Sequence, residues 1–259
     1  MALAHYEILE KLGEGGMGVV YRARDTRLAR LVALKYVRAK DAAARNRGFD
    51  EARAIAALNH PHIATIYEVT ETTNGPVLVL EHLPGQTLRS RLAAGPLSVA
   101  EILTYGLQIA EGLAYAHRHG LIHGDVKPEN LMFTADGVLK ITDFGLARSC
   151  HEGTVTLNGE VAGTPKYMAP ECFQDWPPDC RTDIFSLGVV LEEMAAGRSM
   201  PEAFHRVVGR ATARERAQRF ASMEDVASAL RSIEEAPKAS LCDTPAILVI
   251  EVKAATPDR

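Results

Sequence analysis

The spacing of hydrophobic and polar positions predicts mainly strands in the first third of the chain. Residues 6–38 alternate short apolar runs with turn signals, which favours a three-stranded antiparallel meander. Residues 42–58 have helical apolar spacing and end at Asn59-His60-Pro61, a helix-stop signal. Two further strands are expected at 63–71 and 76–83. This part of the chain therefore predicts a small sheet with one helix.

From Gly85 onward the pattern favours helices. Ser98 with Glu101 three residues later is a capping box that opens a long helix to about His119. Residues 184–197 are apolar nearly all round, which predicts a buried helix at the centre of this region. Further expected elements are short strands at 131–133 and 138–141, an irregular segment from Asp143 to about Cys180, and helices at 202–213 and 222–235, the second capped by Ser222 with Asp225.

Composition narrows the function classes. The chain has 259 residues, 47% of them hydrophobic, which is enough for one large domain or two small lobes. A net charge of −4 gives no electrostatic case for nucleic acid or an anionic membrane. No apolar run approaches the ~20 residues that span a bilayer. The four cysteines lack metal-site spacing and fit free thiols in a reducing cytosol, so we expect a cytoplasmic protein; a membrane anchor outside this chain stays open.

A glycine-rich motif lies between the first two predicted strands. Gly13-Glu14-Gly15-Gly16-Met17-Gly18-Val19-Val20 matches G-x-G-x-x-G-x-V. Glycines let a backbone approach phosphate oxygens, and turn N–H groups supply donors. A strand on each side argues against the dinucleotide-binding motif, in which a helix follows. Alone, the motif fits a plain turn equally well.

The third predicted strand carries a lysine among apolar residues. Lys35 follows Ala33-Leu34, and burying its ammonium group in such a strand costs free energy unless the group pairs with a negative charge. A phosphate together with Glu51, on the following helix, would satisfy it. A lysine at a sheet edge that reaches water is the alternative.

The strongest motif is His123-Gly124-Asp125-Val126-Lys127-Pro128-Glu129-Asn130, followed by Asp143-Phe144-Gly145. In sequence order, these segments supply a candidate base at Asp125, a cation at Lys127, an amide oxygen at Asn130 and a carboxylate at Asp143. Phosphoryl transfer requires this set, because a hydroxyl must be oriented, a metal bound and developing charge neutralised.

With these motifs the chain resembles the protein kinase superfamily, specifically the bacterial Ser/Thr kinases related to eukaryotic ones, from about Tyr6 to Glu234. The resemblance implies that Lys35 holds the α- and β-phosphates and pairs with Glu51. Asp125 would be the catalytic base, Lys127 would contact the γ-phosphate, and Asn130 and Asp143 would bind Mg²⁺ or, alternatively, Mn²⁺. The implied nucleotide-binding residues are Leu12, Gly13, Gly15, Gly16, Gly18, Val20, Ala33, Lys35, Leu80 as gatekeeper, Glu81 to Leu83 as hinge, and Met132.

The resemblance also implies structural roles. Ile55, Ile66, His123 and Phe144 would stack as a spine between the lobes, anchored by Asp183. Glu171 would pair with Arg219. The run Gly163-Thr164-Pro165-Lys166-Tyr167-Met168-Ala169-Pro170-Glu171 is typical of Ser/Thr kinases, with Thr164 linking Asp125 and Lys127, and it argues against small-molecule kinases. Thr154 and Thr156 are candidates for autophosphorylation or ordinary polar loop residues.

Two departures from the family pattern stand out. Gly124 replaces the arginine that usually binds a phosphorylated activation loop, which leaves Arg148 as a nearby cation. The stretch from Gly197 to Arg219 is short, so a substrate-docking helix is expected to be missing, and apolar residues exposed there would mark a partner site. The run 246–250 could cover such a patch.

We therefore expect an α+β, two-lobed kinase-like fold with a shortened C-lobe. The predicted kinase domain covers 1–236, divided into an N-lobe at 1–80, a hinge at 81–85 and a C-lobe at 86–236. Residues 237–259 are expected to form a tail, flexible or packed as one strand. The predicted function is ATP- and Mg²⁺-dependent phosphorylation of protein Ser/Thr, without nucleic acid or membrane partners, and a homodimer is an open alternative. A nucleotide-binding pseudokinase that serves as an interaction module is the second hypothesis.

Overall fold

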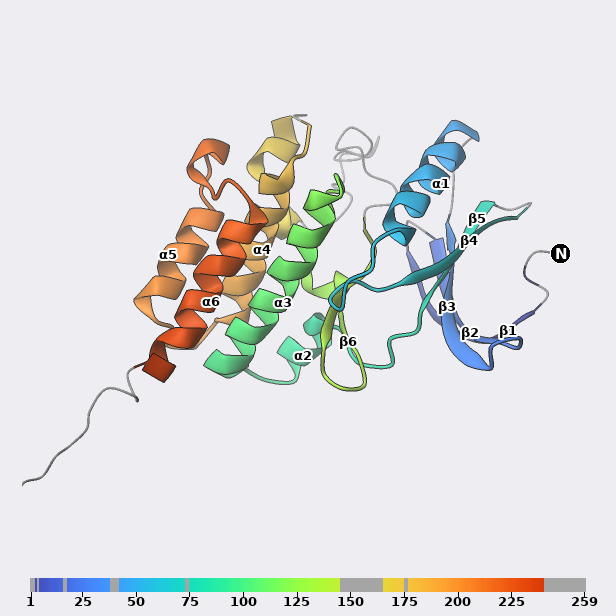
Figure 1. Cartoon of the computed structure of the whole chain (residues 1–259), viewed down its shortest axis with the longest axis horizontal. Coiled ribbons are helices and arrows are strands. Elements are labelled where there is room, and N and C mark those ends of the chain that lie inside the picture. The colour runs from blue at the N-terminus through green and yellow to red at the C-terminus, as the bar shows by residue number, and fades with distance from the viewer. Residues whose placement is uncertain are drawn as a thin grey trace, which may run out of the picture.

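The computed structural model describes residues 3, 5–15, 18–37, 42–72, 75–144, 165–174 and 177–239. They form two lobes that lie next to each other along the longest axis of the molecule (Figure 1). One lobe is a sheet accompanied by a single helix, and the other is mainly helical. The predicted α+β, two-lobed fold is confirmed.

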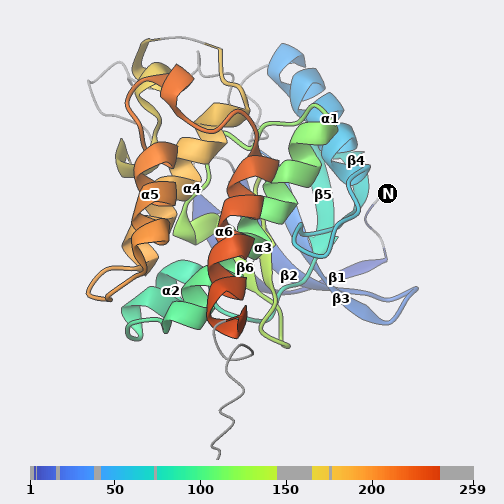
Figure 2. The ribbon, with the colours of Figure 1, turned by 60° about the vertical axis from the view of Figure 1, so that its left-hand side comes forward.

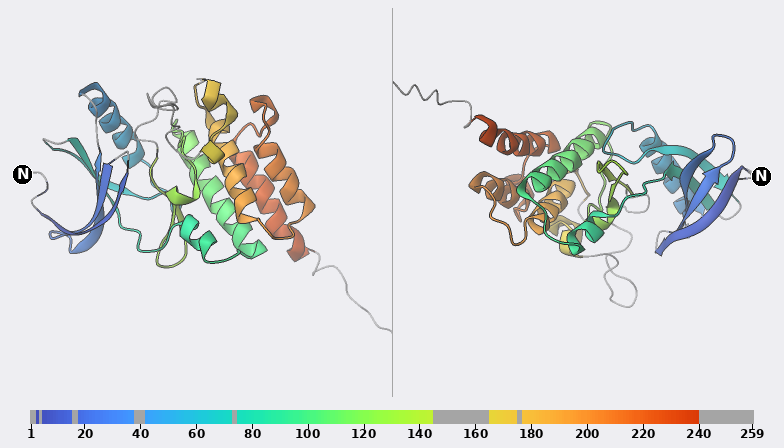
Figure 3. Two further views of the ribbon diagram at one scale, coloured as in Figure 1. Left: turned by 180° about the vertical axis from the view of Figure 1, so that it is seen from behind. Right: turned by 90° about the horizontal axis from the view of Figure 1, so that it is seen from below.

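The N-lobe is built on a five-stranded antiparallel sheet in the order β1-β2-β3-β5-β4. The strands are β1 (Tyr6–Gly15), β2 (Gly18–Asp25), β3 (Arg30–Val37), β4 (Ile66–Thr72) and β5 (Gly75–Glu81), and the helix is α1 (Ala42–Ala56). The predicted meander and helix are therefore confirmed. Strand β3 lies in the middle, so its apolar residues Val32, Ala33 and Leu34 are buried, whereas β1 is an exposed edge. Figure 3 shows α1 alongside this sheet.

The C-lobe packs its helices around α3 (Val99–Arg118) and α4 (Cys180–Met194). Figure 2 shows α6 running beside α3, with α5 beside α4. The predicted capping box opens α3, because Ser98 Oγ accepts from Glu101 N at 3.2 Å and Ser98 N donates to Glu101 Oε2 at 2.8 Å. The other elements are α2 (Leu88–Ala93), α5 (Glu202–Ala211), α6 (Met223–Ala239), the strand pair β6 (Leu131–Phe133) and β7 (Leu139–Ile141), and short 3-10 turns at Pro128–Asn130, Pro165–Tyr167, Pro170–Gln174 and Arg216–Gln218.

Several element ends differ from the sequence pattern by a few residues, and three helices show why. Helix α4 begins four residues before the predicted 184, because the side chain of Asp179 accepts from Arg181 N at 2.7 Å and caps it. Helix α2 was not predicted separately; the Thr87 side chain caps it by accepting from Ser90 N at 3.1 Å. Helix α6 starts at the predicted Ser222–Asp225 cap and runs to Ala239, past the expected domain end at 236. The rest of the predicted tail, including 246–250, lies outside the described residues.

The short stretch after α4 is filled by one amphipathic helix. Between α4 and α6, α5 buries an apolar face made of Phe204, Val207, Val208 and Ala211. The exposed apolar patch that the short stretch could have left does not form in the described C-lobe, where Phe173 is the one large hydrophobic residue among the exposed ones. The amphipathic pattern of α5 explains this, since the helix turns its apolar face inward.

One hydrophobic cluster contains residues of both lobes and joins them behind the interlobe cleft. It includes Ile55 and Leu78 from the N-lobe together with Leu131 and Ile141 from the C-lobe. Ala64 N donates to Ile141 O at 2.9 Å, which attaches the segment before β4 to β7.

Among the described residues, none of the helices has the length and apolar character needed to cross a membrane.

Candidate active site

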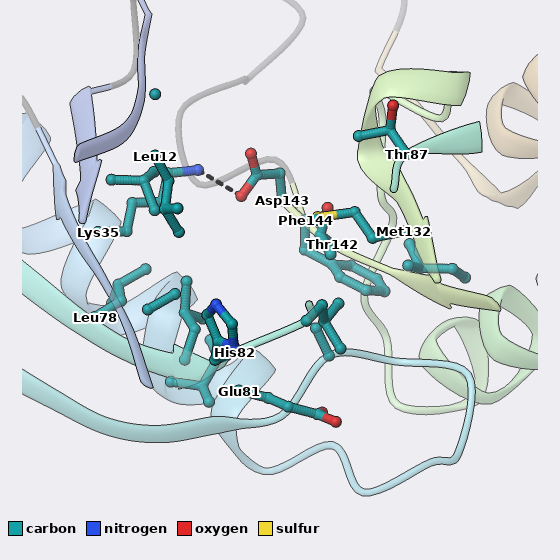
Figure 4. Close-up of a pocket in the computed structure, with 18 of the residues that line it drawn as sticks. Leu12, Lys35, Leu78, Glu81, His82, Thr87, Met132, Thr142, Asp143 and Phe144 are labelled. Carbon is teal, nitrogen blue, oxygen red and sulfur yellow. Dashed lines mark hydrogen bonds and ion pairs between the residues drawn. The ribbon is translucent and has the colours of Figure 1, made fainter. Parts of the chain in front are cut away.

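A cavity of about 370 Å³ lies between the lobes (Figure 4). Its size is in the usual range for small-molecule pockets. The sheet contributes Leu12, Gly13, Val20 and Ala33, all of which were predicted to bind nucleotide. The predicted gatekeeper Leu80 also lines the cavity. So do the hinge residues Glu81, His82 and Leu83, and Met132 on β6.

The strand register explains why these N-lobe residues meet. Gly13 pairs with Val20, and Val20 pairs with Lys35 on β3. Ala33 in turn pairs with Leu80 on β5. Because side chains alternate across a sheet, Val20, Ala33 and Lys35 face the same side. A register slip of one residue would turn all three away.

The cavity also has walls that the motifs did not identify. Thr87 and Glu129 line it, together with Ile55, Ala64, Ile66, Leu78, Ile141, Thr142 and Phe144. Thr87 carries a recognisable N-cap signal ahead of α2, so its sequence could have located that end of the helix. Glu129 stands inside the strongest motif, but the order of residues did not show that it lines the cavity or that its carboxylate accepts from Arg89 Nε at 2.8 Å.

The glycine-rich hairpin requires glycine at one position on steric grounds. Gly18 has φ +143°, and a Cβ built there would come within 1.8 Å of Tyr36 O. Gly15 pairs with Gly18 across the hairpin. Neither glycine lines the cavity, and the predicted Gly16 lies outside the described residues.

Lys35 is buried and paired with Asp143. Its Nζ donates to Asp143 Oδ1 at 2.7 Å, and only 4% of the lysine side chain is exposed. Asp143 has a left-handed φ of +56°, which aspartate tolerates better than most residues. Glu51 was predicted as the partner of Lys35; its side chain lies outside the part of the chain that the structure describes. The two ends of the described pair come from different lobes, so this ion pair spans the cleft (Figure 4).

The loop of residues 123–130, called the catalytic loop after its predicted role, brings three predicted residues together. Lys127 Nζ donates to Asp125 Oδ2 at 2.6 Å. Asn130 Nδ2 donates to the same carboxylate oxygen at 3.1 Å and to the Asp125 carbonyl at 2.8 Å. These contacts hold the Asp125 carboxylate beside one cation and one amide. The predicted linking residue Thr164 lies outside the described residues, as do Thr154, Thr156 and Arg148.

A buried aspartate anchors this loop to α4. Asp183 is fully buried and accepts from the backbone N–H groups of His123 and Gly124, each at 2.8 Å. The His117 ring bonds to it at 2.8 Å. Burial raises the pKa of Asp183, but hydrogen bonding and attraction from His117, with smaller contributions from His123 and Gly124, lower it below its usual value. The predicted anchor is therefore present.

His123 has a structural place, as predicted. Asp125 N donates to its Nδ1 at 3.1 Å, so the ring proton belongs on Nε2, which donates to Thr142 O at 3.0 Å. The His123 ring packs against Phe144 with centroids 4.7 Å apart. The loop of Asp125 and the segment of Asp143 are thus held together through one buried imidazole.

The predicted pair of Glu171 and Arg219 is also formed. Two parallel bonds of 2.7 and 2.8 Å join the guanidinium to both carboxylate oxygens in a buried environment. Burial raises the pKa of Glu171, but the hydrogen bonds from Arg219 lower it overall. This pair braces segment 165–174 against the turn before α6.

The geometry fits a phosphate-bearing nucleotide and a hard divalent cation. The buried Lys35 and the Asp143 carboxylate both line the cavity, and a carboxylate is an oxygen ligand of the type such cations prefer. Asn130, the other predicted ligand, lies on the adjoining loop, where its carbonyl accepts from Thr142 N at 2.8 Å. A protein kinase domain model matches residues 6–247. This chain belongs to the protein kinase domain family.

Bacterial Ser/Thr kinases are similar to this kinase domain. A probable serine/threonine-protein kinase of Clostridium acetobutylicum is 41% identical over 197 residues, covering 74% of this chain and 30% of the relative. PknL of Mycobacterium bovis is 34% identical over 264 residues, covering 90% of this chain and 66% of PknL. PknB of Mycolicibacterium smegmatis is 40% identical over 202 residues, covering 74% and 32%. The chain therefore spans less than a third of the clostridial relative and of PknB.

Proposed function

We propose that this chain is a Ser/Thr protein kinase domain that transfers the γ-phosphate of ATP, with Mg²⁺, to protein hydroxyls. The observation that carries the proposal is the pairing of Lys35 with Asp143 at the interlobe cavity, next to a loop in which Lys127 and Asn130 both donate to the Asp125 carboxylate. Asn130 O accepts from Thr142 N at 2.8 Å, which joins that loop to the wall of the cavity. Members of the family use ATP and a divalent metal, and the relatives' names specify serine and threonine.

Each group has a distinct role in the proposed reaction. The Asp125 carboxylate orients the acceptor hydroxyl and accepts its proton as the oxygen attacks the γ-phosphorus, while the bond from that phosphorus to the bridging oxygen breaks and ADP leaves. The ammonium of Lys127, 2.6 Å from that carboxylate, neutralises negative charge on the transferring phosphoryl group. Lys35 holds the non-transferred phosphates, and the adenine lies between Val20, Ala33 and Met132.

The metal ligands are Asn130 and Asp143 in this proposal. When bound, Mg²⁺ neutralises charge on the phosphate oxygens. Asp143 is held near the cavity by Lys35, and Asn130 is held by its own bonds to Asp125. Gly18 lets the glycine-rich hairpin pack against β3, because a Cβ at that position would come within 1.8 Å of Tyr36 O.

The test is phosphate transfer from labelled ATP to a generic protein substrate. Asp125→Asn and Asp143→Asn should each lower transfer by at least about a hundredfold, since each removes a charge that acts in the transition state. Asp136→Asn is the matched control, because Asp136 lies on the exposed turn between β6 and β7. Equal background signal from the wild type and both variants would contradict the proposal and favour the pseudokinase hypothesis.

A further inference from the structure

The outward face of α5 carries three exposed arginines, Arg206, Arg210 and Arg214, which we call the arginine row. Arg206 and Arg210 are four residues apart, so they lie on the same side of the helix, about 6 Å apart along its axis. Arg214 follows just past the end of the helix. Figure 1 shows α5 at the end of the C-lobe away from the N-lobe, so the arginine row lies outside the active site.

The chain leaves the charges of the arginine row largely uncompensated. Arg206 Nη1 lies 3.9 Å from Glu202 Oε1, and 68% and 78% of these two side chains are exposed. This contact is longer than a hydrogen bond, and such an exposed pair contributes little free energy. In the described part of the chain, neither Arg210 nor Arg214 forms an ion pair with a carboxylate. A chain with a net charge of −4 therefore has a local excess of cations here.

Contacts with the protein hold two of the three arginines in place. The guanidinium of Arg210 lies over the ring of the buried Phe220, 4.3 Å from its centroid. The buried Arg219 donates to the carbonyls of Ala213 at 2.9 Å and Arg214 at 3.3 Å, which fixes the backbone that carries the third arginine. A cation that is already positioned loses less conformational entropy when it binds an anion.

An exposed glycine adjoins the arginine row. Gly209 lies within α5, next to Arg210 and three residues after Arg206. Glycine destabilises a helix interior relative to alanine, so its presence there usually has a packing reason or a functional one. Packing does not require it, because a Cβ built at Gly209 would meet no atom within 4 Å. The missing side chain leaves a low area where the backbone of another chain can approach the helix.

We propose that the arginine row is a docking site for an extended acidic segment of a partner protein. Alternate residues of an extended chain point to the same side, about 6.6 Å apart, which matches the spacing of about 6 Å between Arg206 and Arg210. The ligand therefore carries carboxylates at every second position, each of which accepts from one guanidinium, and its backbone lies over Gly209. This site is separate from the interlobe cavity, and the proposal goes beyond the proposed kinase function.

The experiment measures the affinity of fluorescein-labelled peptides by anisotropy, in the absence of nucleotide. Two peptides have the same composition of glutamate and serine, with the glutamates at alternate positions in one and consecutive in the other. The wild type should bind the alternating peptide at least about threefold more tightly. Arg206→Gln/Arg210→Gln should weaken its binding about tenfold and abolish the preference, as expected when two exposed ion pairs are lost.

Two further variants separate docking from net charge and from stability. Arg118→Gln/Arg231→Gln is the matched control, because it removes the same charge from exposed arginines that pair with Glu224 at 2.8 Å and Glu111 at 2.7 Å. It should leave both affinities within about twofold. Gly209→Gln improves helix propensity, so the urea midpoint should not fall, but its side chain should weaken binding of the alternating peptide about threefold.

Several outcomes would overturn the proposal. Equal weakening by the two double variants would mean that net charge alone governs binding. Equal affinity for the two peptides would remove the evidence for an extended ligand. RNA of the same charge that displaces the alternating peptide as well as the unlabelled peptide does would mark a surface for polyanions in general. Because no phosphate is transferred in these assays, the expected pattern supports the docking site even if the kinase function fails.

Discussion

Gly124 lies in the catalytic loop with φ +72°, in the left-handed region that disfavours other residues. Its N–H donates to Asp183 Oδ1 at 2.8 Å, so the left-handed backbone of Gly124 and this hydrogen bond support each other. A Cβ built there would meet no atom within 4 Å. A larger residue at position 124 would therefore destabilise the loop through its backbone conformation and not through a steric clash. Glycine, which stands where the family usually has arginine, avoids this conformational strain.

We expect Gly124→Ala to lower the free energy of unfolding by about 1 kcal/mol, the cost of a left-handed alanine. Gly209→Ala should act in the opposite direction and stabilise by roughly 0.5–1 kcal/mol, because Gly209 lies within α5 and also has open space for a Cβ. Urea denaturation of both variants measures the difference. Destabilisation of both to the same extent would refute the conformational explanation.

At the scale of elements, three carboxylates tie the catalytic loop and segment 165–174 to their surroundings. Glu171 pairs with Arg219, Asp183 holds the loop, and Glu193 binds Tyr167 and Lys166. In all three, burial raises the pKa but hydrogen bonds and nearby cations outweigh it, so each carboxyl titrates below its usual range. A folded pKa below the unfolded value stabilises the folded state above the unfolded pKa.

We therefore predict that the unfolding free energy falls as the pH is lowered from about 5 towards 2. For Glu193, a change in pKa from 4.5 to about 2 corresponds to at most about 3 kcal/mol. Glu193→Gln removes this titration, so its stability should depend less on pH over that range. The exposed neighbour Glu192→Gln is the control. The measurement is the urea midpoint of the wild type and both variants at pH 6 and at pH 3.5. If the midpoint falls by the same amount between these two pH values in all three proteins, the prediction is contradicted.

At the scale of the whole molecule, the proposed catalytic groups are held by contacts within and between the lobes. Lys35 reaches Asp143 across the cleft, and the loop of Asp125 is anchored on α4 through Asp183. Gly124 supplies no cation for a phosphorylated activation loop. The described catalytic geometry thus depends on buried anchors.

We predict that activity depends little on phosphorylation of the activation loop. The double variant Thr154→Ala/Thr156→Ala should retain kcat/KM to within about tenfold, a change of 1.4 kcal/mol. Both threonines lie outside the described residues, so the prediction rests on Gly124 and on the Asp183 anchor. Phosphate transfer to a protein substrate, with both proteins at equal concentration, is the measurement. A loss of several hundredfold would show that a phosphothreonine is required.

Much of the fold and site follows from local sequence. The capping box at Ser98 and Glu101, the meander of β1 to β3, and the motif around Asp125 were all predicted, because caps, alternation and turn glycines act over a few neighbouring residues. The pairing of Glu171 with Arg219 followed from the family resemblance, and the structure confirms it.

The strand order and the distant contacts needed the tertiary structure. Nothing in the alternation of β5 places it beside β3, and nothing near Lys35 identifies Asp143, which is 108 residues away, as its neighbour. The partners of Arg89 come from three separate segments. The sequence by itself determined which elements form and which chemical groups are present, since those depend on local backbone and side-chain preferences. Only the packing of the two lobes decided which charges meet, because a buried charge takes whichever partner the fold brings within reach.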